Sequence, residues 1–448
     1  MKFSTLKKFF FFTLIITAAA LLSGCSGAPA GQSEPGGDSA ELVIISPHWE
    51  GIRIEFNRAF KQWYAAQGKG DVEITWLDQG GTSDDVRFIR SGFSRNPETI
   101  DVDILYGGGI DPYIEFAKEG LLVPFKLPDD VVSKLPKSVG GIPVYDEQYR
   151  WYGASLAGFG ILYNKKLLDM YGLDAPAAWI DLAKPGFRGL VGSSDPRHSG
   201  SMHMMYEIIL QAYGWDEGWR ILLGMGANVR NFPKSSTQTG KDLQTGEIAA
   251  GLSIDTYAFS AIEEVGAKRL GFILPQQATV ITPDPIAILK GAPNIEVAQD
   301  FIRFSLSPEG QKIWMYRKGE AGGPVEFSLN KMSVLPELYE TDFRAVSNIT
   351  VNPFEYRKGF SYDFAKGAER WTLLNDMVGA LIIDVHDDLA AAAEKFAGDG
   401  EKLAAAFAPP VSEDQAMKLT RESWSDEVER NRVINKWLDY ARKNYRAK

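Results

Sequence analysis

Three strand–loop–helix units follow one another between residues 41 and 118, and this alternation limits the fold more than any other feature of the sequence. The first unit opens with a continuous apolar run at residues 42–45, which is typical of a strand buried on both faces. Alternating strands at 72–76 and 102–105 begin the other two units, and glycines follow each of them. Such a series predicts an α/β fold with a parallel, doubly wound sheet. Ligands bind such sheets at the carboxyl ends of the strands, where the three loops lie.

Two of these units carry recognisable helix starts. Thr82 and Asp85 have the spacing of a capping box, so we expect Thr82 to cap the helix that follows. Asp111 and Pro112 have the residue types of an N-cap and a first helical position. Both helix starts therefore fall at the predicted ligand-binding edge of the sheet.

A second α/β stretch, residues 181–275, lies between two β-rich extended segments at 152–163 and 280–290. A middle domain between two such connections implies that later sequence completes the first domain. This arrangement predicts two lobes with a cleft and a paired hinge, and the apolar stripes near the C-terminus predict further helices. We expect lobe 1 at 41–154 and 283–345, lobe 2 at 155–282, and a helical C-terminal extension at 346–448.

The N-terminal segment predicts export and membrane attachment. Three lysines and an apolar run at 9–22 precede Cys25, which is the single cysteine of the chain. Residues 1–24 thus have the anatomy of a signal peptide, and Leu22-Ser23-Gly24-Cys25 resembles a bacterial lipobox. We expect lipid attachment at Cys25, followed by a flexible Ser/Gly/Pro-rich tether over 25–40. The protein would then be exported and anchored to a bacterial membrane, facing the periplasm or the cell exterior.

Composition and motifs exclude several classes of function. The net charge of −10 argues against nucleic acid as a partner. The chain has four histidines and lacks the G-x-S-x-G, H-E-x-x-H and P-loop patterns, so we expect no enzyme. A tethered extracytoplasmic enzyme or a ligand sensor remains as a rival interpretation. We expect a monomer.

Three stretches resemble the extracellular solute-binding proteins of bacterial ABC importers, in the subset that binds ferric iron or phosphorylated organic molecules. They are PAAWIDLAKPGFRGLVGSSDPRHSGS, LQTGEIAAGLSIDTYA and PIAILKGAPNIEVAQDFIRFSLSPEGQKI. The likeness covers about residues 41–335. It implies a two-lobed, type II-like periplasmic-binding-protein fold with two doubly wound sheets and a hinge. It also implies a small-molecule ligand held between the lobes and an ABC permease as partner.

Two loops in opposite lobes favour an anionic ligand, such as a phosphorylated or carboxylated compound. Each combines glycine with hydroxyl groups directly before a helix, and a helix N-terminus attracts anions. The alternative interpretation is structural: both loops are ordinary capped helix starts. The candidate ligand-binding residues here are Gly81, Thr82, Ser83, Asp195, Arg197, His198, Ser199, Gly200 and Ser201.

Ferric iron is the alternative ligand, and it prefers hard donors such as phenolates, carboxylates and imidazole. His48, Asp195 and Tyr257 would be its ligands, with Tyr106 and Asp255 as further candidates for the site. Iron-binding relatives usually carry two consecutive tyrosines near the position of Tyr257, and this chain has one. Trp49 follows a predicted strand end and could stack on a sugar or an organic ring. We expect no cofactor, unless a ferric ion is bound. The sequence leaves the identity of the ligand open.

Overall fold

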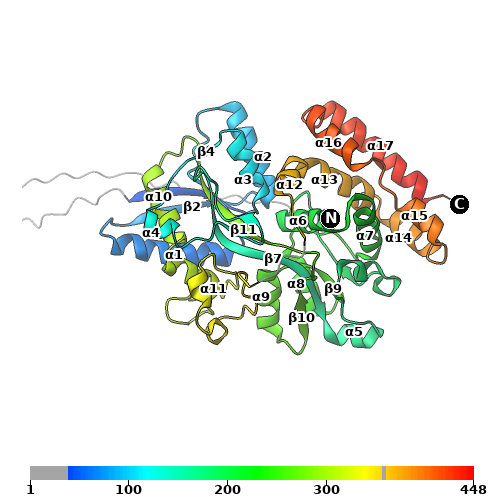
Figure 1. Ribbon diagram of the computed structural model, residues 1–448, viewed down its shortest axis with the longest axis horizontal. Helices are drawn as coiled ribbons and strands as arrows, with labels where there is room; N and C mark the ends of the chain where they lie inside the picture. Colours follow the sequence, from blue (N-terminus) through cyan, green and yellow to red (C-terminus); the bar gives the residue numbers. More distant parts are fainter. Residues whose placement is uncertain (1–38, 356–359, 448) are drawn as a thin grey trace, which may run out of the picture. The chain divides into compact units, whose positions relative to one another are not determined.

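The computed structural model describes residues 39–355 and 360–447 (Figure 1). These residues contain a mixed nine-stranded sheet in the order β2-β1-β3-β11-β7-β9-β8, with β10 paired to β7 and β4 paired to β11. The strands are β1 Ala40–Ile45, β2 Val72–Leu77, β3 Ile104–Tyr106, β4 Leu122–Val123, β7 Tyr152–Asn164, β8 Val191–Gly192, β9 Ala250–Ile254, β10 Leu270–Ile273 and β11 Ile281–Leu289. A separate hairpin pairs β5 Ser138–Val139 with β6 Ile142–Pro143.

Helices connect and cover these strands. The helices that begin before residue 310 are α1 Glu50–Ala66, α2 Thr82–Arg95, α3 Asp111–Lys118, α4 Asp129–Val132, α5 Lys165–Tyr171, α6 Gly200–Tyr213, α7 Trp215–Asn228, α8 Thr237–Thr245, α9 Asp255–Val265, α10 Ile295–Ser305 and α11 Pro308–Met315. Those nearer the C-terminus are α12 Phe364–Glu369, α13 Trp371–Val378, α14 His386–Lys395, α15 Gly400–Ala406, α16 Glu413–Glu422 and α17 Glu427–Tyr445. No helix within 39–355 or 360–447 is both long and apolar enough to cross a membrane.

The sheet has two halves. In half A, which we define as β1–β4 and β11 with α1–α3, α10 and α11, strand β1 pairs in parallel with both β2 and β3. This is the predicted series of three units, and its apolar runs are buried because helices cover both faces of the sheet. In half B, defined as β8–β10 with α5–α9, β8 and β9 are also parallel.

The two extended segments predicted as crossovers are β7 and β11. They lie side by side as antiparallel strands, from Ile281 opposite Gly158 to Ile286 opposite Tyr152. Beyond residue 158, β7 leaves β11 and pairs with β9 and β10 in half B. The same strand thus belongs to both halves, which is the geometry that a paired hinge requires. The division into lobes at the predicted boundaries stays a prediction.

The helical C-terminal extension is present as predicted, with its helices between residues 364 and 445. One apolar stripe of this extension, formed by Leu374, Val378, Leu381 and Val385, is buried in the same apolar cluster as α6 and α7. Tyr362 and α12 also reach α3 of half A, and α13 packs on α6 of half B, so the extension contacts both halves of the sheet (Figure 1).

Two predicted helix caps are wrong. Gly81, not Thr82, is the N-cap of α2, and no side chain caps this helix. Asp111 is the first helical residue of α3 rather than its N-cap, because its carboxylate accepts a hydrogen bond from Tyr362 instead of from its own helix. The predicted signal peptide, Cys25 and the tether up to residue 38 lie outside the described residues.

Candidate functional site

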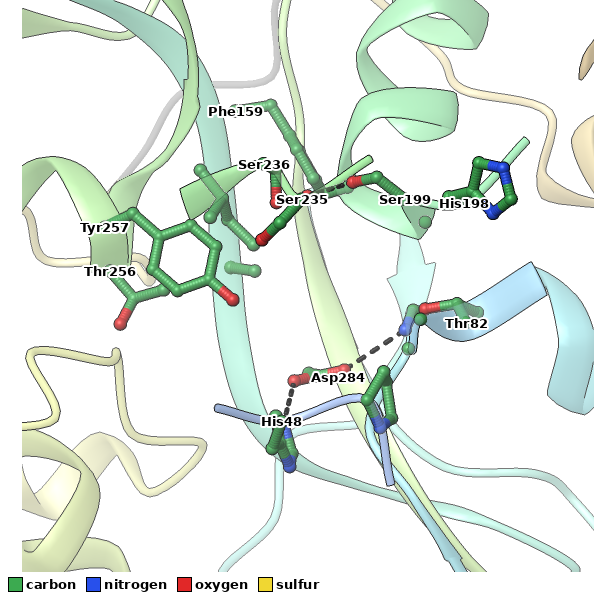
Figure 2. A pocket seen from close by; sticks show the side chains of 18 of the residues that line it. His48, Thr82, Phe159, His198, Ser199, Ser235, Ser236, Thr256, Tyr257 and Asp284 are labelled. Carbon is green, nitrogen blue, oxygen red and sulfur yellow. Dashed lines mark hydrogen bonds and ion pairs between the residues drawn. The ribbon is translucent and has the colours of Figure 1, made fainter. Parts of the chain in front are cut away.

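A pocket of about 110 Å³ lies between half A and half B, beyond the carboxyl ends of β1, β2 and β3 (Figure 2). Its half A wall comes from the loops that lead to α1, α2 and α3. Its half B wall comes from the starts of α6, α8 and α9, and β7 and β11 cross behind it. The position agrees with the general rule that open α/β sheets bind ligands at this edge.

Eight of the fourteen predicted ligand-binding residues line this pocket. They share a position at a strand end or at a helix start, and they come from both halves: His48, Gly81, Thr82, His198, Ser199, Gly200, Ser201 and Tyr257. The two loops that the sequence singled out as anion-friendly therefore face one another across one cavity. The binding role of these residues stays a prediction.

The other six predicted residues do not line the pocket. Trp49 packs edge-on against Phe327, with ring centroids 5.4 Å apart. Tyr106 is fully buried in the core of half A. Arg197 holds Asp195 through its Nε and Nη2 atoms, at 2.9 and 2.7 Å. Ser83 and Asp255 are buried helix-start residues that adjoin lining residues.

An ionic cluster forms one wall of the pocket. Nε2 of His48 lies 3.0 Å from Oδ2 of Asp284 (Figure 2). The ammonium of Lys331 pairs with the same carboxylate. Gly109 donates its main-chain N–H to Oδ1 of Asp284 at 3.1 Å. Three separate segments of the chain are thus bound to one carboxylate of β11.

Burial opposes ionisation of the side chains in this cluster, and their charged neighbours determine which of them is ionised. Burial opposes the charged form of Asp284, but Lys331 and His48 outweigh it and hold the pKa of that carboxyl well below its usual range. Burial also lowers the pKa of His48, against the opposing effect of Asp284. At neutral pH the cluster is therefore an ionised Asp284 paired with Lys331 beside an uncharged imidazole. Its net charge is close to zero.

Four helices begin at the pocket wall. Thr82 opens α2, Ser199 and Gly200 start α6, Ser236 precedes α8, and Thr256 lies in the first turn of α9. The first N–H groups of a helix have no intrahelical acceptor, and the helix dipole makes this end favourable for negative charge. Four such ends around one cavity give it a positive character that Asp284, neutralised by Lys331, does not cancel.

The loops of the two halves touch each other at the mouth of the pocket. A Cβ on Gly81 would lie 1.9 Å from the main-chain oxygen of His198, and a Cβ on Gly200 would lie 2.6 Å from Oγ1 of Thr82. Nδ1 of His198 also lies 3.4 Å from Oδ2 of Asp84. The glycines at positions 81 and 200 are therefore needed for contact between the two halves.

Tyr257 directs its hydroxyl group toward the cavity (Figure 2). Burial, with a contribution from Asp284, raises the pKa of Tyr257 to about 12, so the phenol is protonated at neutral pH. Of the three predicted iron ligands, His48 and Tyr257 line the pocket, while Asp195 is engaged by Arg197 outside it. The described residues contain no cluster of three or more His, Cys, Asp or Glu side chains suited to a metal ion.

Several pocket residues were missed by the sequence interpretation. Asp284 and Lys331 were overlooked because the first lies inside a strand that otherwise reads as buried, and the second lies in an irregular segment. The acid between Pro283 and Pro285 was the available signal, since a buried charge needs a partner. Lys234, Ser235 and Ser236 also line the pocket, and their Lys-Ser-Ser sequence before α8 repeats the hydroxyl-rich pattern of the other loops.

Solved structures of similar fold are periplasmic binding proteins. AfuA from Actinobacillus pleuropneumoniae, with fructose-6-phosphate bound, is 21% identical with a TM-score of 0.61, and the alignment covers 77% of this chain and 99% of AfuA. Iron-bound HitA from Pseudomonas aeruginosa is 20% identical with a TM-score of 0.57, covering 76% of this chain and 99% of HitA. The predicted periplasmic-binding-protein fold is thereby confirmed.

The family follows from the sequence match. Residues 102–347, more than half of the chain, match the family of bacterial extracellular solute-binding proteins, and the chain belongs to that family. The phosphoglycerate transport regulatory protein PgtC of Salmonella typhimurium is 33% identical over 159 residues, or 36% of this chain. The match spans 39% of the length of PgtC. The family resemblance found in the sequence is thereby confirmed. The family and the fold are those of transport binding proteins.

Proposed function

We propose that this protein is the substrate-binding component of an ABC importer and captures a small anionic solute, phosphorylated or carboxylated, between halves A and B. It then delivers the solute to a permease, without catalysing a reaction. We further propose that Cys25 carries a lipid that holds the protein at a bacterial membrane, and that the protein acts as a monomer.

The observation that carries this proposal is the convergence of four helix starts, two of them in facing loops, on one pocket. A single helix N-terminus favours an anion by about 0.3–1 kcal/mol at the surface and by more when it is partly buried. Hydroxyl groups of Thr82, Ser199, Ser201 and Ser236 surround the same space. Such a lining suits a phosphate group, because phosphate oxygens accept several hydrogen bonds at once.

Ferric iron is the second candidate, since His48 and Tyr257 both reach the pocket. The buried phenol of Tyr257 would have to lose its proton, and His48 already donates to Asp284. Asp284 is the single acid among the described lining residues, and its carboxylate is already paired with the ammonium of Lys331. This donor set favours an anionic solute over the cation.

Calorimetric titration of the purified protein tests the proposal. The panel comprises inorganic phosphate, a phosphoglycerate, fructose-6-phosphate, a dicarboxylate and ferric citrate, with sodium chloride as the reference salt. We expect a phosphorylated compound to bind with micromolar or tighter affinity, which corresponds to about −8 kcal/mol or better. Binding of ferric iron with a visible phenolate absorption band, and of no anion, would replace the proposal with the iron alternative.

A charge placed in the pocket provides the matched variant. Ser236→Asp adds a carboxylate at the start of α8, and we expect it to weaken phosphate binding about tenfold or more by charge repulsion. Ser133→Asp adds the same group at an exposed position away from the pocket and serves as control. Equal affinities of the two variants would contradict the assignment of this pocket.

A further inference from the structure

We propose that the C-terminal extension acts as a latch across the cleft, in which Tyr362 and Asp111 are positioning residues that retain the bound solute. The latch consists of Tyr362, α12 and α13, and it joins α6 of half B to α3 of half A (Figure 1). The inference rests on the proposed function, because a latch requires two halves that separate to release a solute.

The extension is firmly fixed to α6. The guanidinium of Arg370 donates to Glu207 from Nε at 2.9 Å and from Nη2 at 2.7 Å, and both side chains are completely buried. One turn earlier on α6, Nδ1 of His203 lies 2.8 Å from Oδ1 of Asn375. The centroids of the His203 and Trp371 rings are 3.6 Å apart. A buried ion pair that loses one partner leaves an uncompensated charge, so this side of the latch resists separation.

The contact with α3 is tightly packed around a single hydrogen bond. The hydroxyl of Tyr362 donates to Oδ2 of Asp111 at 3.2 Å, and both residues are buried. Gly367 of α12 packs directly on this pair, since a Cβ there would lie 2.3 Å from the Tyr362 hydroxyl oxygen and 3.1 Å from Oδ2 of Asp111. Among the residues that the structure describes, a hydrogen bond and packing hold this side and no ion pair joins it to α3, so we expect this side to part when the halves move.

The latch spans the same opening as the pocket. Asp111 opens α3 two residues after Gly109, which lines the pocket, and Glu207 lies two turns into α6, whose first residue also lines it. Any movement that separates the wall of α3 from the wall of α6 therefore pulls Asp111 away from Tyr362. Closure of the cleft and engagement of the latch are one event, and the latch slows the release of a captured solute.

The test compares three variants of the full-length protein in detergent solution, with inorganic phosphate as probe. Tyr362→Phe removes the hydroxyl and keeps the ring, and Gly367→Val forces α12 away from α3. Tyr440→Phe is the matched control, because it removes a tyrosine hydroxyl that donates to Ala408 within the extension. We expect phosphate release, measured by stopped-flow fluorescence, to be about fivefold or more faster in the first two variants, which is the size expected for one buried hydrogen bond. Association rates and the control should match the unaltered protein.

Release rates and solution scattering distinguish a failure of the latch from a failure of the proposed function. If phosphate binds and Tyr362→Phe and Gly367→Val release it at the rate of the unaltered protein, the latch is refuted and the proposed function stands. If no solute binds to any form, the proposed function fails, and small-angle X-ray scattering then decides the latch. A larger radius of gyration of both variants would support it, and unchanged profiles would overturn it. A structural role within the extension alone would lower the melting temperature without changing either readout.

Discussion

Nε2 of His48 lies 3.0 Å from Oδ2 of Asp284, although the two residues are 236 positions apart in the sequence. The contact joins the loop after the first strand to the last strand of half A, and Lys331 completes it from a third segment. Asp284 of β11 thus ties separated parts of the chain together in half A. The pocket wall is therefore also a structural joint.

Removal of the Asp284 carboxylate tests this joint. Asp284→Asn leaves Lys331 buried without a charge partner, and we expect a loss of about 3–5 kcal/mol in the free energy of unfolding, measured by urea denaturation. The double variant Asp284→Asn/Lys331→Met should recover part of that loss. Asp129→Asn, which breaks an exposed pair with Lys126, is the control and should leave stability unchanged. A double variant no more stable than the single one would contradict the ion-pair explanation.

Contact between the two loops at the pocket mouth predicts the effect of a single methyl group. Gly81→Ala places a Cβ against the main-chain oxygen of His198, so we expect the halves to close incompletely and the affinity for the solute to fall about tenfold or more. Gly398→Ala adds the same methyl group where no atom lies within 4 Å. Titration calorimetry should show a loss for the first variant only, with melting temperatures of both near that of the unaltered protein. Full affinity in Gly81→Ala would show that this contact is not needed for binding.

A buried carboxyl group on α2 predicts a pH dependence of stability. Burial, together with the charges of Asp78 and Asp84, raises the pKa of Asp85 to about 8. The folded protein therefore holds a proton that the unfolded chain releases above pH 4, so the stability from this group falls as the pH rises from about 4 to about 8. Asp85→Asn should reduce the slope of stability with pH and stabilise the protein at pH 8 by an amount on the order of a few kcal/mol.

Urea denaturation at pH 5 and pH 8 measures this difference. Asp439→Asn, at an exposed position of α17, serves as the control and should retain the slope of the unaltered protein. If Asp85→Asn also retained that slope, the carboxyl group would be ionised in the folded state, and the interpretation of its burial would be wrong.

The fold could be predicted because its signals are local and periodic. The apolar runs of β1 and β2 alternate with helical stripes, and the two extended segments that became β7 and β11 are visible as β-rich stretches. Which strand ends lie together follows from the topology of a parallel sheet, so the pairing of the loops at Gly81 and Gly200 could also be inferred. The confirmed family resemblance agrees with this derivation.

The remaining features depend on contacts that no local pattern encodes. Asp284 reads as an irregularity within an apolar strand, because nothing in its neighbourhood reveals that His48 and Lys331 approach it in space. The stripes of the C-terminal helices indicate which faces are buried but not against what, so the contact of Tyr362 with Asp111 was not predicted. The same contact explains the wrong cap of α3, since Asp111 turns away from its own helix.

A crystal structure of the protein with a bound phosphorylated solute tests the central claim most directly. We expect the phosphate group to lie in the pocket and to accept hydrogen bonds from main-chain N–H groups at the starts of both α2 and α6, one from each half. A phosphate group bound elsewhere, or held by one half alone, would contradict the account.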